Sequence, residues 1–229
     1  MRILNVGDLH LPATRKGYLQ FCMDIYEAWD CDTVVFAGDV VDWHAISFHA
    51  KNPHLPGPTD EYELACVGVR RWAEAFPEAY VCIGNHDKRP SRLAKTVNIP
   101  DFMLKDYNEI WPADGWIWDY SFKLDDINFR HGKGCRGIHP AWNLMNKTQQ
   151  SCSIGHCHTR AGIKWFSNDT TRKFGMDVGC GVDAKMWQFV YQEDNPVRPF
   201  LSCGVVIDGI PHLEPMPCGI GEGYHDSRF

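Results

Sequence analysis

Residues 32–42, DTVVFAGDVVD, join a short apolar run directly to acidic side chains. The β-branched and aromatic residues at 33–37 favour a buried strand. Gly38 permits a tight turn directly after that strand, and Asp39 and Asp42 follow. Because open α/β sheets bind ligands beyond the carboxyl ends of their strands, this stretch predicts an α/β fold and also the sheet edge at which a functional site lies.

The same arrangement recurs on both sides of this stretch. Apolar runs at 3–6 and 79–83 predict two further strands, and amphipathic patterns at 18–29 and 61–76 predict helices between the strands. Strand–helix–strand alternation at this spacing is typical of a parallel sheet with right-handed crossovers.

The second half of the chain has a different pattern, dominated by short strands. Asp208-Gly209 lies between alternating flanks in VVIDGIPHLEP (205–215) and predicts a β-hairpin. We expect loops at 42–60 and 195–199, and two sheets packed together with helices outside. The length of 229 residues fits one domain, expected to span residues 1–229. The other predicted elements are strands at 116–124, 127–130, 151–154, 163–166 and 174–178, and a helix at 140–149.

Composition and charge limit the classes to which the protein can belong. Its net charge is −6 and its pI about 6.0, which disfavours a protein that coats nucleic acid nonspecifically. Asn5 and Asp8 interrupt the N-terminal apolar stretch, so no signal peptide is expected. Since no run of about 18 apolar residues occurs, we also expect no membrane association. The ten cysteines are scattered without a CxxC motif, which favours reduced thiols and a cytoplasmic location.

Polar motifs follow five of the predicted strands. Because strand ends of this kind meet at one edge of a sheet, we expect the five motifs to form one site. They are Asp8-Leu9-His10, Gly38-Asp39-Val40-Val41-Asp42, Gly84-Asn85-His86-Asp87, His131-Gly132 and Gly155-His156-Cys157-His158.

The last motif poses the question of which side chain binds a ligand. In an extended segment, residues i and i+2 point the same way, so His156 and His158 can reach one site while Cys157 faces away into packing. The same spacing holds for Asp8 and His10. A zinc-finger interpretation, which would use Cys157, is therefore disfavoured.

The motifs supply too many donors for one tetrahedral zinc ion. Seven oxygen or nitrogen donors suit two divalent metals about 3.5–4 Å apart, with Asp39 as the natural bridge. Two carboxylates offset only half of the four positive charges, so an anionic substrate such as a phosphate is favoured. The seven predicted ligands are Asp8, His10, Asp39, Asn85, His131, His156 and His158.

In this order, the five motifs resemble those of the calcineurin-like metallophosphoesterase family. The resemblance implies a four-layer α/β/β/α sandwich of two mixed sheets with helices on both outer faces, which agrees with the expectation above. It also implies that His86 acts on the substrate and that Asp42 supports His86. One implied metal set is Asp8, His10, Asp39 and His158, and the other is Asp39, Asn85, His131 and His156.

The resemblance also bears on the substrate. Family members that cleave protein phosphomonoesters carry an arginine directly after the position of Asp42 and a glutamate in place of Asp87, whereas this chain has Trp43 and Asp87. The pattern is closer to phosphodiesterases and SbcD-like DNA nucleases. We therefore expect a dinuclear-metal-dependent phosphodiesterase that acts on a nucleotide or nucleic acid by attack of a metal-bound hydroxide. The alternatives are a phosphomonoesterase and a non-catalytic metal-binding scaffold for a protein partner, like the retromer subunit that resembles this family.

Several finer assignments stay open at the level of sequence. Manganese is the expected metal, although the donors also suit iron, zinc, cobalt or nickel. Arg89 in KRPSRLAK and Lys133 in RHGKGCR are candidate phosphate contacts, with solvated surface charge as the alternative. Asp87 is expected to cap a helix. The aromatic run YNEIWPADGWIWDY (107–120) is expected in the core, with a platform for a base as its alternative.

Overall fold

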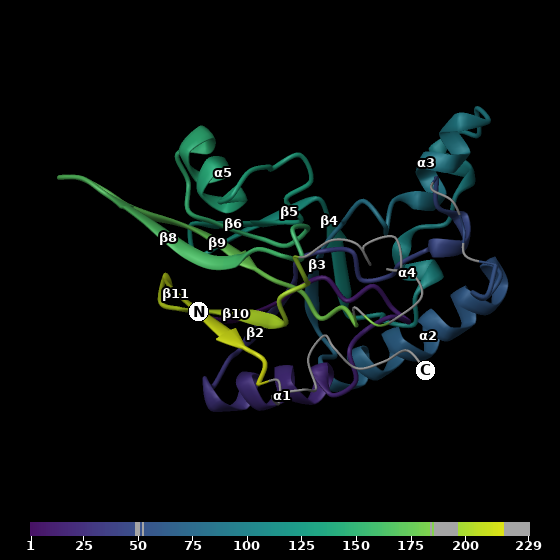
Figure 1. Cartoon of the computed structure of the whole chain (residues 1–229), viewed down its shortest axis with the longest axis horizontal. Coiled ribbons are helices and arrows are strands. Elements are labelled where there is room, and N and C mark those ends of the chain that lie inside the picture. Colours follow the sequence, from purple (N-terminus) through teal and green to yellow (C-terminus); the bar gives the residue numbers. More distant parts are fainter. Residues whose placement is uncertain (49–50, 52, 184, 186–196, 218–229) are drawn as a thin grey trace.

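The computed structural model describes residues 1–48, 51, 53–183, 185 and 197–217, and it contains two mixed sheets (Figure 1). In the first sheet, the strand order is β11-β10-β1-β2-β3-β4. Strands β1 to β4 run parallel, and the β10–β11 hairpin pairs antiparallel with β1. The bounds are β1 Arg2–Val6, β2 Thr33–Phe36, β3 Ala79–Cys82, β4 Trp116–Asp119, β10 Ser202–Ile207 and β11 Ile210–Pro215.

The second sheet has the order β5-β6-β7-β9-β8. Its central strands β6, β7 and β9 are parallel, and the edge strands β5 and β8 are antiparallel to their neighbours. The bounds are β5 Ser121–Leu124, β6 Ile127–Arg130, β7 Cys152–Ile154, β8 Ala161–Ser167 and β9 Arg172–Val178.

Helices cover the outer face of each sheet (Figure 1). Helices α1 (Tyr18–Ala28) and α2 (Pro58–Ala75) lie on the first sheet, and α5 (Pro140–Thr148) lies on the second. The expected α/β/β/α sandwich is thus confirmed. Two further helices, α3 (Arg89–Thr96) and α4 (Tyr107–Ile110), lie beyond β4, and 3-10 turns occupy His44–Ile46 and Asp101–Met103.

Alternation within the central strands explains their continuous apolar runs. Leu4 and Phe36 pack toward the helices, whereas Ile3 and Val35 pack against the second sheet. Both faces of these strands are therefore buried, as is usual for parallel strands between two layers. Because these strands run parallel, their carboxyl ends point to one edge of the sandwich, where the polar motifs begin.

The structure corrects one predicted strand. Residues 116–124 form two strands in different sheets, because the chain bends at Tyr120 and crosses from β4 to β5. Of the aromatic residues there, Trp116 is buried and donates from Nε1 to Phe76 O at 2.9 Å, whereas Tyr120 is 55% exposed. Helix α3, the helix expected to follow Asp87, coincides with the basic segment KRPSRLAK.

The predicted hairpin is confirmed. Asp208 and Gly209 have φ values of 48° and 78°, the left-handed conformations that a two-residue turn of this type requires. The loop expected at 42–60 contains a 3-10 turn and ends where α2 begins at Pro58; positions 49, 50 and 52 lie outside the described residues. Of the loop expected at 195–199, residues 195 and 196 lie outside them too.

Helix α5 packs closely on β9 at Gly175, which supplies a test of the sandwich. A Cβ atom at this position would lie 2.6 Å from Ala141 O. Gly175→Ala should therefore push α5 away from the sheet and lower the free energy of unfolding by about 1–3 kcal/mol, measured by urea denaturation. Gly57→Ala is the matched control, since its Cβ would meet nothing within 4 Å. Equal stability of the two variants would contradict this packing.

Candidate metal centre

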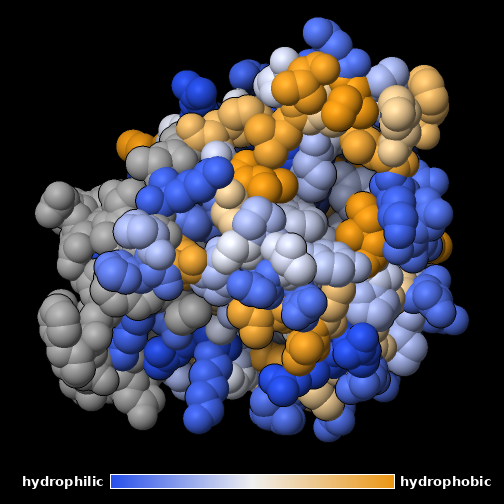
Figure 2. All heavy atoms as spheres, turned by 90° about the vertical axis from the view of Figure 1, so that its right-hand side faces the viewer, coloured by the Kyte–Doolittle hydropathy of each residue, from blue (hydrophilic) through white to orange (hydrophobic). Residues whose placement is uncertain are grey.

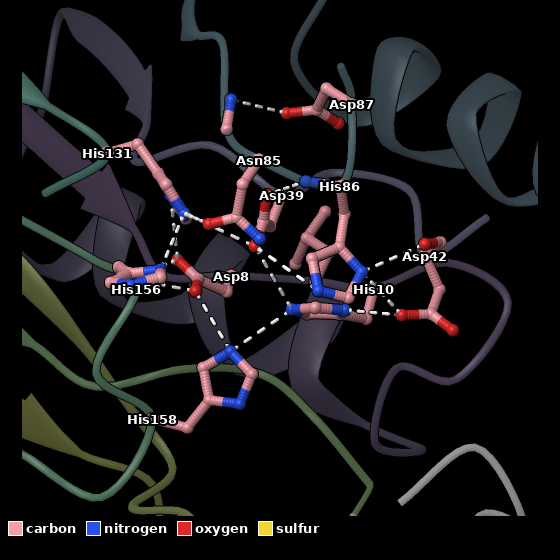
Figure 3. A network of polar contacts seen from close by, with 12 residues as sticks. Asp8, His10, Asp39, Asp42, Asn85, His86, Asp87, His131, His156 and His158 are labelled. Atoms are coloured by element: carbon pink, nitrogen blue, oxygen red, sulfur yellow. Dashed lines mark hydrogen bonds and ion pairs between the residues drawn. The ribbon is translucent and has the colours of Figure 1, made fainter. Parts of the chain in front are cut away.

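The five polar motifs meet at one edge of the sandwich (Figure 3). The first sheet contributes the residues that follow β1, β2 and β3, and the second sheet contributes those that follow β6 and β7. All seven predicted ligands belong to this cluster, as do His86 and Asp42. Side chains separated by about 150 positions are in direct contact there, since His158 Nε2 lies 3.0 Å from Asp8 Oδ2.

One group of potential ligands contains Asp8, His10 and His158. His10 Nε2 lies 3.1 Å from His158 Nε2, and Asp8 is fully buried. The backbone N–H of His156 donates to both carboxylate oxygens of Asp8, at 2.9 and 3.1 Å. This contact fixes the Asp8 carboxylate and ties the loop after β1 to the loop after β7.

A second group contains Asp39, His131 and His156, with Asn85 beside them. Its common point is His131 Nε2. Asp39 Oδ2 lies 3.2 Å from that atom, Asn85 Oδ1 3.1 Å and His156 Nδ1 3.1 Å. These four side chains are the set that the family resemblance implies for one metal.

The tautomer of His131 shows why this group fits a cation. His131 Nδ1 lies 3.0 Å from Ala37 O, and a carbonyl oxygen only accepts, so Nδ1 carries the proton. In the neutral ring, Nε2 then carries a lone pair that faces the oxygens of Asp39 and Asn85. The surrounding oxygens require a positive charge, which either a second proton on this ring or a cation bound in place of that proton supplies. The donor chemistry therefore fits a divalent metal.

The pKa values of the buried histidines and carboxylates also show that negative charge gathers in this cluster. Burial acts to lower the pKa of His131, but the carboxylates of Asp39 and Asp8 outweigh it and raise that pKa to about 10. Burial acts to raise the pKa of Asp39, but the histidines His131, His86 and His10 hold it well below its usual range. Burial and the charge of His86 lower the pKa of His10 to about 4.

Asp42 orients two histidines at once. It accepts from His10 Nδ1 at 2.7 Å through Oδ1, and His86 Nδ1 lies 2.9 Å from both Oδ1 and the main-chain oxygen of Asp42. Both rings therefore turn Nε2 toward Asp39 Oδ2, at 3.7 Å for His10 and 3.9 Å for His86. The buried Arg89 donates from Nη1 to Asp42 O at 2.6 Å, and its Nη2 lies 3.2 Å from His86 Nε2.

Asp87 has a different role from the expected helix cap. Helix α3 has Lys88 at its N-cap without a side-chain cap bond. The buried Asp87 carboxylate instead accepts from Gly84 N at 2.8 Å and Val41 N at 3.2 Å, so it joins the loops after β2 and β3. Burial and the nearby Asp39 raise its pKa to about 7.

The local geometry behind two predicted ligand pairs is also corrected. His10 and His156 have φ values of 50° and 70°, so both pairs lie in left-handed turns rather than in extended segments. The paired side chains reach the site nevertheless. Cys157 is only partly buried, with Sγ 3.9 Å from Cys135 O, and it lines the cleft beside the histidines instead of packing into the core.

The cleft above the cluster has a volume of about 640 Å³. Two arginines line it: Arg136, which lies in the basic cluster noted in the sequence, and Arg160, which sequence reasoning missed although it closely follows the last histidine motif. Lys133 is exposed and is not among the lining residues, whereas Arg89 is buried beside His86. Cationic side chains therefore border the histidine cluster, as binding of an anion requires.

No curated protein matches this chain. Among solved structures, a metallophosphoesterase from Sphaerobacter thermophilus has 15% identity and a TM-score of 0.47, with 95% of this chain and 88% of that chain covered. Vacuolar Protein Sorting 29 from Cryptosporidium parvum has 12% identity and a TM-score of 0.45, with 93% and 94% covered. The E. coli phosphoesterase YfcE has 12% identity and a TM-score of 0.44, with 90% and 88% covered.

A comparison with sequence models of protein families matches most of the chain. The sequence model of the calcineurin-like phosphoesterases matches residues 1–184, a span that contains all five polar motifs and the three groups of potential metal ligands. This protein therefore belongs to the calcineurin-like phosphoesterase family.

Proposed function

We propose that the protein is a dinuclear-metal-dependent phosphodiesterase that acts on a nucleotide or a nucleic acid. Family membership supports metal-dependent phosphoester hydrolysis. The observation that carries the dinuclear proposal is the position of Asp39 Oδ2, which lies 3.2 Å from His131 Nε2 in one group of potential ligands and 3.7 Å from His10 Nε2 in the other. One shared carboxylate between two ligand groups is the arrangement that a pair of cations needs.

Each proposed ion has four residues, and Asp39 belongs to both sets. Divalent ions bound there would lower the pKa of a coordinated water and stabilise charge on a phosphoryl group. Manganese is the metal we propose, and iron, zinc, cobalt and nickel suit the same mixed donors. The first ion would be held by Asp8, His10, Asp39 and His158, and the second by Asp39, Asn85, His131 and His156.

His86 is the proposed proton donor to the leaving oxygen. Its Nδ1 is held by Asp42, so Nε2 is the atom that exchanges a proton in the cleft. Burial acts to lower the pKa of His86, but Asp39 and Asp42 outweigh it and raise that pKa, which suits an acid. Arg89, 3.2 Å from the same atom, is placed to attract a phosphate oxygen. Lys133, exposed on its loop, is a weaker candidate for such a contact.

Two further features bear on where in the cell the proposed enzyme works. None of the helices in the described parts of the chain is long and apolar enough to cross a lipid bilayer. Every cysteine within the described residues is a free thiol, which supports the proposal that the protein works in the reducing cytoplasm.

A role in binding a protein partner is the second candidate. Figure 2 shows apolar side chains gathered at the top of one face, where Figure 1 places α3. Residues that follow this helix are strongly exposed: Val97 64%, Ile99 40%, Phe102 86% and Met103 66%. An exposed apolar patch of this kind is typical of a docking surface. Such a patch can occur on an enzyme as well as on a scaffold. Measured turnover of a phosphoester therefore distinguishes the two candidate functions.

Substitution of His86 separates catalysis from metal binding. His86→Ala should lower kcat about 10²–10⁴-fold on a dinucleoside monophosphate, whose alkoxide leaving group needs a proton, because general acids contribute that much, while metal content measured by plasma mass spectrometry stays near wild type. Asp39→Ala and Asn85→Ala should lose both metal and rate, because each removes a proposed ligand. Equal activity in all three variants would refute the assignment.

Metal removal and a substrate panel test the reaction class. Chelation should abolish turnover, and added manganese should restore it. Under those conditions a diester should be cleaved faster than p-nitrophenyl phosphate, the monoester. A faster monoester would favour the phosphomonoesterase alternative. No turnover of either ester, in protein shown to hold metal, would favour the scaffold.

A further inference from the structure

A second cavity opens beside the proposed metal centre. Its volume is about 310 Å³, and it shares Thr159 and Arg160 with the cleft above the histidines. Its other walls include Trp142 of α5, Lys164 of β8 and Asp177 of β9. A volume near 300 Å³ is at the lower end for small-molecule pockets and suits one ring system. A ligand could thus lie in this cavity while its phosphate reaches the metal centre past Arg160.

Asp177 is the polar group on which this cavity depends. It is buried, with 7% exposed, yet its two oxygens share one donor: Ala141 N, at 3.2 and 3.3 Å. A carboxylate has about four acceptor positions, so the shared bond uses one position on each oxygen and leaves one on each for a ligand. Burial raises the pKa of Asp177 to about 6, as expected where few donors surround a carboxyl group.

The other walls select the kind of ligand. Trp142 is half-buried, with Lys164 Nζ 5.9 Å from its ring centroid. Arg160 and Lys164 bring two positive charges against the single carboxylate, so an ammonium ligand is disfavoured. A neutral, flat ring with several N–H donors would use the aromatic face of Trp142 and the acceptors of Asp177 together.

We propose that this cavity binds the base of a guanine nucleotide, with N1–H and the 2-amino group donating to the two oxygens of Asp177. Guanine presents two adjacent N–H donors on one edge, which match a carboxylate, whereas adenine presents an acceptor next to its amino group. Arg160 lies between the base and the metal centre, where it would meet the phosphate. This inference rests on the proposed phosphodiesterase function and names the substrate class of that site.

The test compares bases within each protein variant. With manganese, kcat/KM for the p-nitrophenyl ester of guanosine 5′-monophosphate should exceed that of the adenosine ester at least about tenfold, because a site left with unpaired polar groups rejects the wrong ligand. The inosine ester, which lacks the 2-amino group, should fall between them. Asp177→Asn should reduce the guanosine-to-adenosine ratio to about one. The amide oxygen of asparagine can still accept from Ala141 N, and a ratio does not depend on how much of the variant is folded.

Matched controls isolate the two parts of the proposed site. Asp169→Asn removes an exposed carboxylate between β8 and β9 and should leave the ratio unchanged. Trp142→Leu should weaken binding of guanosine and adenosine 5′-monophosphates alike, by about tenfold, because stacking tolerates either base. Isothermal titration of these two nucleotides measures that loss and also the base preference, independently of turnover.

The outcomes distinguish this inference from the proposed function. Turnover of bis(p-nitrophenyl) phosphate without a guanine preference in either assay would overturn the base site alone. A guanine preference that persists in Asp177→Asn would also overturn it. Absence of any turnover, with preferential binding of guanosine 5′-monophosphate that Asp177→Asn removes, would uphold the base site and refute the hydrolase.

Discussion

The buried carboxylate of Asp39 is the constraint on which the site depends. Its two oxygens have separate tasks: Oδ1 accepts from His86 N at 2.7 Å, and Oδ2 faces ring nitrogens of His10, His86 and His131. The first contact holds the loops after β2 and β3 together. The second leaves a negative charge that the interior tolerates only with positive partners. Architecture and affinity for cations therefore arise from the same side chain.

The packing of the two sheets determines whether the remaining ligands reach that carboxylate. Asn5 Nδ2 of β1 donates to Ser153 Oγ of β7 at 2.6 Å, inside the sandwich. Close approach of the loops also requires glycine, since a Cβ at Gly155 would overlap the carboxylate of Asp8, and one at Gly84 would overlap that of Asp39. The glycines in the polar motifs are thus part of the site, although they offer no donor of their own.

Much of this arrangement could be predicted because it depends on local pattern. Apolar runs located the parallel strands, and polar residues at their ends located the cluster. Features that depend on contacts distant in sequence were missed. The bend at Tyr120 divides one apolar segment between two sheets, and Asp87 braces two loops rather than α3. The turns at His10 and His156 were missed because residue spacing alone does not reveal a positive φ in residues other than glycine.

The loop that contains Asp8 is held by residues from much later in the chain. Gly181 N donates to Asp8 O at 2.8 Å, so residues made late support a proposed ligand made among the first. A nascent chain leaving the ribosome carries Asp8 and His10 long before it has His158 or the residues that hold Asp8 in place. Assembly of the proposed metal centre must therefore wait until residues as late as Gly181 have been made.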